Sequence, residues 1–137
     1  MDQVTGGCLC GAVRIAARGE PRRVALCHCL DCRKHHGAVF YAAAIFAEDA
    51  VRVTGETRHW KHRHFCPSGV YPERLPQAAS RRGGSVFARW DDEIEVHLGT
   101  LHEPSRFTPT YESWTVRRED WLPAFAGMRG FVGNRES

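Results

Sequence analysis

Three closely spaced cysteines constrain this chain more than any other feature of its sequence. Cys27, Cys29 and Cys32 stand in the run ALCHCLDCRK. Tetrahedral zinc, with Zn–S bonds of about 2.3 Å, needs sulfurs roughly 3.8 Å apart, which a CxxC turn and a same-face CxC pair can both deliver. The sequence therefore predicts a zinc site at these three thiols. Structural zinc sites have four protein ligands and catalytic ones keep a position for water or substrate, so three ligands favour a catalytic site.

A second thiol pair, Cys8 and Cys10, lies in the run GGCLCGAVR. In a reducing cytosol, cysteines at such close spacings are metal ligands rather than disulfides, and a disulfide framework is the alternative reading. The N-terminal run MDQVTGG lacks the pattern of a signal peptide, and the longest apolar stretch, residues 38–47, is too short to span a bilayer. We therefore expect a soluble cytoplasmic protein with no membrane partner.

Composition is that of one small domain. The chain has 137 residues, 42% of them hydrophobic, which suffices for one core of modest size. A net charge of +3 is too weak to indicate nucleic acid or an anionic membrane. Trp60, in the basic run RHWKHRH, could stack on a single-stranded base, but a solvated strand face with one core tryptophan is the simpler reading. No nucleic-acid partner is expected.

The hydrophobic pattern predicts a mainly β fold. Val13, Ile15 and Ala17 alternate with polar residues, as in a strand with one buried face. The continuous apolar run at residues 39–46 fits a buried central strand, although such a run does not by itself separate strand from helix. No helix is signalled. Further strands are expected around Val24 and Leu26 and at residues 51–54, 58–66, 85–90 and 94–98.

Two segments lack any period. Residues 67–84 contain three prolines, three glycines and no alternation, so they predict a long loop, either a surface insertion or a functional element. Residues 127–137 are rich in Gly and Arg and are expected to form a C-terminal tail. The sequence thus predicts a single domain over residues 1–126, followed by the tail.

These motifs resemble the glutathione-dependent formaldehyde-activating enzyme family, which also includes the centromere protein V group. The resemblance covers residues 4–125 and is carried by the strings GGCLCGAVRI, CHCLDCRKHHGAVF, HFC and GGSVFARWDDEIEVHLGTLHEPSRFTPTYESWTVRREDWLP. It implies a β-rich fold like that of the Mss4 proteins, with two zinc sites. It also implies a carbon–sulfur lyase that adds glutathione to formaldehyde or a related small aldehyde, giving S-(hydroxymethyl)glutathione.

The resemblance also assigns the zinc ligands. It places a catalytic zinc on Cys27, Cys29 and Cys32, and a structural zinc on the CxC pair of Cys8 and Cys10 together with a later CxxC pair. Cys66 matches the first cysteine of that later pair, whereas Arg82 stands where the second would be, with residues 68–80 as an inserted stretch. Since Arg cannot ligate zinc, the second site is predicted to be incomplete. His64 is the nearest substitute ligand, with an exposed strand histidine as the plainer reading.

Charged residues beside the third cysteine are weaker candidates. Arg33 and Lys34 could attract a glutathione carboxylate or offset the charge of the thiolates, and a solvated turn is the equal alternative. His28 alternates away from its cysteine neighbours, so we expect it to pack or hydrogen-bond rather than ligate. His35 and His36 could reach the metal or act as acid and base, but as neighbours they cannot both face the site.

The C-terminal portion of the resemblance contains aromatic and charged residues whose spacing carries no catalytic argument. We expect its aromatic side chains to be core and its charged side chains to form surface pairs. These residues are Glu112, Trp114, Arg118, Asp120 and Trp121.

Two classes of function remain open from the sequence. In one, three thiolates with a net charge of −1 around zinc hold an incoming thiol as thiolate, and the protein is an enzyme. In the other, all the cysteines are structural, and the protein is a zinc-stabilised binding module of the same fold. A fourth ligand from the protein would favour the second reading, and an exogenous thiol or water would favour the first.

Overall fold

The computed structural model describes residues 3–62, 75–80 and 83–135. Strands dominate these ranges, as the hydrophobic alternation predicts. They are β1 (Gln3–Gly7), β2 (Arg14–Arg18), β3 (Arg23–Cys27), β4 (Tyr41–Ala47), β5 (Val51–Thr54), β6 (Arg58–His62), β7 (Leu75–Ser80), β8 (Gly83–Trp90), β9 (Glu93–His97), β10 (Tyr111–Ser113) and β11 (Arg129–Gly130). The helical elements are α1 (Leu30–His36) and the short 3₁₀ helices η1 (Glu48–Ala50), η2 (Leu98–Thr100), η3 (Pro104–Arg106) and η4 (Thr115–Arg117).

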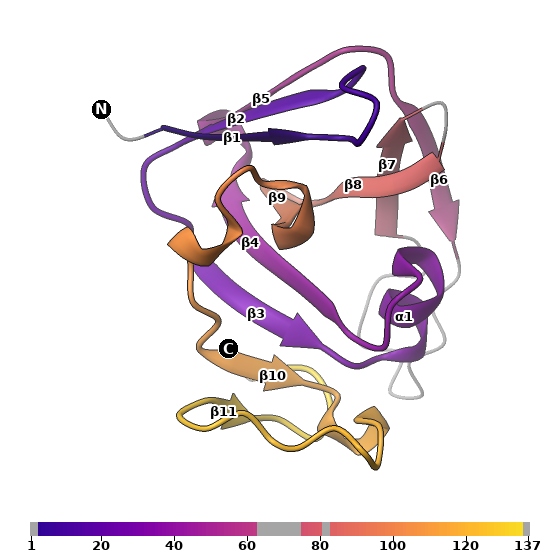
Figure 1. Cartoon of the computed structure of the whole chain (residues 1–137), viewed down its shortest axis with the longest axis vertical. Helices are drawn as coiled ribbons and strands as arrows, with labels where there is room; N and C mark the ends of the chain where they lie inside the picture. Colours follow the sequence, from indigo (N-terminus) through magenta and orange to yellow (C-terminus); the bar gives the residue numbers. More distant parts are fainter. Residues whose placement is uncertain (1–2, 63–74, 81–82, 136–137) are drawn as a thin grey trace.

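Within these described ranges the strands form two sheets (Figure 1). The smaller sheet has the order β1-β2-β5 with antiparallel pairing, and the larger has the order β11-β10-β3-β4-β9-β8-β7-β6. The fold is therefore mainly β and forms one small domain, as predicted. No helix in the described ranges has the length and apolar character needed to cross a membrane.

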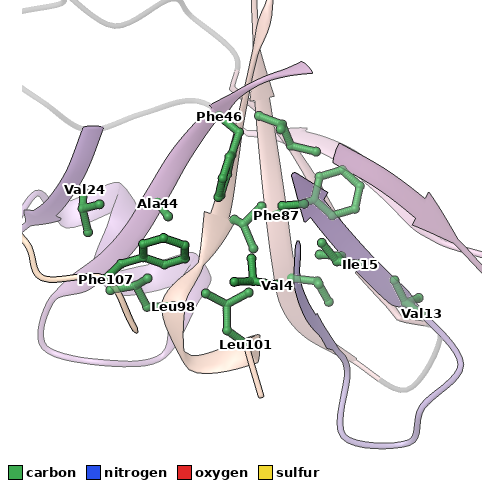
Figure 2. Packing of buried hydrophobic residues seen from close by; sticks show 14 residues of the cluster. Val4, Val13, Ile15, Val24, Ala44, Phe46, Phe87, Leu98, Leu101 and Phe107 are labelled. Carbon is green, nitrogen blue, oxygen red and sulfur yellow. The ribbon is translucent and has the colours of Figure 1, made fainter. Parts of the chain in front are cut away.

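The main core lies between the two sheets. Val4 and Ile15 of the small sheet pack in one cluster with Phe46 and Phe87 of the large sheet, and Figure 2 shows their side chains meeting. The rings of Phe46 and Phe107 meet edge to face, with centroids 5.9 Å apart. The alternation along β1 and β2 thus buries one face of the small sheet against the large one.

β4 lies in the interior of the large sheet, with β3 on one side and β9 on the other. Ala44 and Phe46 point into the main core, whereas Tyr41, Ala43 and Ile45 belong to a second buried cluster on the opposite face. A strand buried on both faces reads as a continuous apolar run. The central strand expected at residues 39–46 is therefore confirmed, with the strand beginning at Tyr41 and ending at Ala47.

Several elements differ from the sequence-based prediction. The helix α1 was not expected, because its seven residues are too few to show a helical period. Gly37, which ends α1 in the left-handed conformation at φ 72° after the basic run Arg33 to His36, is the local signal that could have revealed it. β1, β10 and β11 were also missed. β10 and β11 are too short to alternate visibly, and Gly6 and Gly7 weaken the pattern of β1.

The segment expected as a loop is a strand in part. Residues 75–80 form β7, which pairs with β6 on one side and β8 on the other, and Gly83 and Gly84 begin β8, so the loop prediction is wrong for these eight residues. Pro76 and the lack of alternation concealed a strand that pairing with both neighbours stabilises. Residues 67–74 and 81–82 of the expected loop lie outside the described part of the chain.

The segment expected as a C-terminal tail is hydrogen-bonded along β10 and the turn that follows it. Phe131 N donates to Glu112 O at 2.9 Å, and Trp114 N donates to Gly133 O at 2.9 Å. The Trp114 indole N–H also donates to Asn134 Oδ1 at 2.7 Å. Residues 129–134 therefore cover the outer edge of β10.

Acid sensitivity is expected from the carboxylate at the start of β9. Arg23 Nη2 lies 2.6 Å from Glu93 Oε1, and this hydrogen bond lowers the pKa of the Glu93 carboxyl. Because the folded pKa lies below the unfolded value, the stabilisation is present above about pH 4.5 and is lost as pH falls through the folded pKa. We expect Glu93→Gln to unfold with about 1 kcal/mol less free energy at pH 7, and the difference to shrink below pH 4.

Urea unfolding at pH 7 and pH 3 measures this dependence. The matched control is Glu20→Gln, which removes an exposed carboxylate outside this ion pair and is expected to change stability by less than about 0.5 kcal/mol. A constant gap between Glu93→Gln and the unchanged protein across this range would contradict the role of the ion pair.

Candidate metal centre

The first cysteine group is built where β3 passes into α1. Cys27 is the last residue of β3, and Cys29 is the N-cap of α1, with an extended backbone at φ −64° and ψ 157°. Its Sγ accepts a hydrogen bond from Cys32 N at 3.3 Å, in the manner of an N-cap side chain. The CxxC spacing is thus the first turn of the helix, which brings Cys32 back towards Cys29.

The three sulfurs form one buried cluster. All three Sγ atoms lie within 4.8 Å of one another, and those of Cys29 and Cys32 are 3.1 Å apart. The three residues are between 0% and 7% exposed and pack with Tyr41 and Trp114 in the second buried cluster. Three buried, converging thiol sulfurs match the donor set of a thiophilic metal, and the 3.1 Å pair would have to open to roughly 3.8 Å around a zinc ion.

The chemical state of these thiols depends on a cation. A hydrogen bond with the Cys29 side chain, together with burial, raises the pKa of Cys27 to about 11, although hydrogen bonds with Cys32 and Ser113 act in the opposite direction. Contacts with Cys27 and Cys29, followed by burial, raise the pKa of Cys32 well above its usual range. Packed alone, Cys27 and Cys32 therefore retain their protons at neutral pH, whereas a bound cation would replace these protons. The cluster fits a zinc ion on this chemistry.

The cluster has three members among the side chains that the structure describes. Asp31, His35 and His36 lie on α1, but their side chains are outside the described part. The open fourth position, from which the sequence favoured catalysis, therefore stays a prediction.

His28 does not join the cysteines. Its side chain is fully buried, and Nε2 lies 2.8 Å from Glu112 Oε1, which confirms the expectation that His28 hydrogen-bonds rather than ligates. The other carboxylate oxygen, Glu112 Oε2, accepts a hydrogen bond from Arg118 Nη2 at 3.0 Å. Glu112 is only 2% exposed, so its expected place in a surface pair is wrong.

The two tryptophans of the same segment differ in burial. Trp114 is 4% exposed and belongs to the core, as expected, whereas Trp121 is 69% exposed and the core assignment is wrong for it. Nothing in the spacing of these residues separates the buried Glu112 and Trp114 from the exposed Asp120 and Trp121. Their burial depends on which of them β10 places against β3.

The two basic residues after Cys32 lie at the surface of α1. Arg33 Nη2 is 3.5 Å from Glu119 Oε1, and both side chains are about one-third exposed. Lys34 is exposed. Binding of a glutathione carboxylate by Arg33 or Lys34 stays a prediction.

The second cysteine group lies in the turn between β1 and β2, which Figure 1 shows apart from α1. The Sγ atoms of Cys8 and Cys10 are 3.4 Å apart, and Val13 N donates to Cys8 Sγ at 3.2 Å. Cys8 is half-buried and Cys10 is exposed. Two thiols thus converge as the first half of a metal site requires. The other residues considered for this site, Cys66, His64 and Arg82, lie outside the described residues.

The family described as glutathione-dependent formaldehyde-activating enzyme matches residues 3–117. The chain belongs to this family. The match spans both described cysteine groups and β10, and it confirms the resemblance seen in the sequence. A comparison with curated proteins gives no significant match. Membership indicates a glutathione-dependent, formaldehyde-activating type of function, with the buried cluster of Cys27, Cys29 and Cys32 as the place that could hold a metal ion.

Proposed function

We propose that this protein is a carbon–sulfur lyase that catalyses the reversible addition of glutathione to formaldehyde or a related small aldehyde. In the forward direction the thiol sulfur bonds to the carbonyl carbon, and the thiol proton ends on the carbonyl oxygen of S-(hydroxymethyl)glutathione. The observation that carries the proposal is the buried cluster of three thiols in a member of this family. Free thiols at this spacing suit a reducing compartment such as the cytoplasm.

Cys27, Cys29 and Cys32 would hold a zinc ion, which supplies positive charge that keeps an incoming thiol ionised at neutral pH. Tyr41 and Trp114, packed on the cysteines, shield the sulfurs from bulk water. Arg33 and Lys34, on the helix that begins at the cluster, are the proposed contacts for a glutathione carboxylate. The second site, on Cys8, Cys10 and Cys66, is proposed to lack its fourth cysteine.

Exchange spectroscopy by NMR tests this proposal directly. Zinc-loaded protein is expected to accelerate interconversion of formaldehyde, glutathione and their adduct without changing the equilibrium concentrations, because a catalyst lowers the barrier in both directions. The same reactants without protein give the spontaneous rate, and zinc-free protein gives the contribution of the polypeptide. A rate with zinc-loaded protein no greater than these two controls would contradict the proposal and favour a zinc-stabilised binding module.

A further inference from the structure

A buried polar network lies directly behind the first cysteine group. His28, Glu112 and Arg118 are joined by hydrogen bonds of 2.8 and 3.0 Å through the two oxygens of one carboxylate. His28 and Glu112 are 0% and 2% exposed. A buried carboxylate is costly unless it is paired and hydrogen-bonded, and here each carboxylate oxygen has a partner.

This network is attached to the segment that carries the thiols. His28 stands between Cys27 and Cys29, so a shift of its main chain also shifts both cysteines. β10 runs parallel to β3 with Glu112 opposite Leu26 and Ser113 opposite Cys27. His28 N also donates to Ser113 O at 3.1 Å. The same two residues of β10 therefore hold the ring and the main chain of His28.

The hydrogen-bonded network of His28, Glu112 and Arg118 holds the main chain at the point where it leaves the sheet. β3 ends at Cys27 and α1 begins at Leu30, so residues 28 and 29 belong to neither element. Cys29 is fixed from the helix side, because its carbonyl accepts from Arg33 N and its Sγ accepts from Cys32 N. His28 is held mainly from β10, whose Glu112 lies 84 positions further along the chain, and its ring also meets that of Phe40 edge to face.

From this geometry we propose that Glu112 is a positioning residue of the metal centre. Through His28 it holds Cys27 and Cys29 in the arrangement in which their sulfurs converge with that of Cys32. Arg118, whose side chain is partly exposed, orients the buried Glu112 carboxylate through its hydrogen bond to Oε2. Glu112 itself contacts neither metal nor substrate in this role. The inference rests on metal binding by the cysteine cluster and not on the proposed reaction.

Cobalt(II) bound to the full-length chain provides the test, because its visible absorption reports ligand geometry and its release to a chelator reports the lifetime of the site. Mutation of a residue that orients a metal ligand typically lowers metal affinity by about 10–100-fold. We expect Glu112→Gln to bind cobalt with unchanged stoichiometry, a shifted spectrum and roughly 10-fold faster release. Arg118→Gln, at the outer end of the network, should shift both readouts in the same direction by a smaller factor.

Two controls separate positioning from general stability. Glu119→Gln makes the same chemical change in the surface partner of Arg33 and should release cobalt within about twofold of the unchanged protein. Ile15→Val weakens the main core, whereas Cys27, Cys29 and Cys32 belong to the second buried cluster, so its effect on cobalt release calibrates what lost stability alone does.

Release from both Glu112→Gln and Arg118→Gln that stays within twofold of the unchanged protein would overturn the proposal. So would faster release that Ile15→Val reproduces, once both rates are compared at equal free energy of unfolding. If Glu112→Gln fails to fold, the same measurements are made on Arg118→Gln alone. Cobalt release within twofold of the unchanged protein, or faster release that Ile15→Val reproduces, would then overturn the proposal. Absence of cobalt from the unchanged protein would remove the metal centre and the inference with it, whatever the protein does to glutathione and formaldehyde.

Discussion

Replacing Cys29 by Ser is expected to remove close to one equivalent of bound zinc per chain and to return aldehyde–thiol exchange to the rate of zinc-free protein. Cys29 is fully buried, and its Sγ is 3.1 Å from that of Cys32, so its loss removes one of the three described sulfur ligands. A serine hydroxyl is a poor substitute for a thiolate at a zinc ion held by sulfur. Zinc per chain, measured after exhaustive dialysis, and the NMR exchange rate are the two readouts.

Thermal stability should fall together with the zinc content. Structural zinc contributes on the order of 10 kcal/mol in small zinc peptides, whereas a whole domain is stable by only about 5–15 kcal/mol. Cys10→Ser is the matched control for the exchange rate alone, because Cys10 is exposed and belongs to the other cysteine group, which is itself a proposed metal site. It should leave the exchange rate unchanged. Full zinc content in a variant with serine at positions 27, 29 and 32 would show that the metal is bound elsewhere.

The second large effect is expected in the core between the two sheets. Phe46 is fully buried, and its ring packs edge to face against Phe107. Phe46→Ala removes this contact and leaves a cavity, which costs about 3–5 kcal/mol. For a domain of this size, that loss lowers the melting temperature by about 10–20 °C.

Circular dichroism during heating measures the Phe46→Ala effect, with Val132→Ala as the control. Val132 is 72% exposed, so the same kind of truncation there should change stability by less than about 0.5 kcal/mol. Similar melting temperatures for the two variants would contradict the packing of the main core.

Much of the fold could be predicted from local pattern. The alternation at Val13, Ile15 and Ala17 predicts β2, because one face of the small sheet is buried and the other faces solvent. The run at residues 39–46 predicts β4, because that strand is buried on both faces. The close spacing of Cys27, Cys29 and Cys32 likewise predicts their convergence, since a single turn brings them together.

Other elements depend on partners far away in the sequence. β7 contains Pro76 and has no alternation, and its pairing with β6 and β8 decides that it is a strand. α1 has a cysteine in place of the usual N-cap residues, so its start becomes visible only when the Cys29 sulfur is seen accepting from Cys32 N.

The sequence by itself determined the mainly β character, the central strand and the three-thiol cluster, because each depends on residues within a few positions of one another. The tertiary structure alone decided that Glu112 is buried behind those thiols while Trp121, nine positions later, is exposed. The parallel pairing of β10 with β3 makes this choice. A local hydrophobic pattern predicts which residues are buried, but it does not predict which distant strand packs against them.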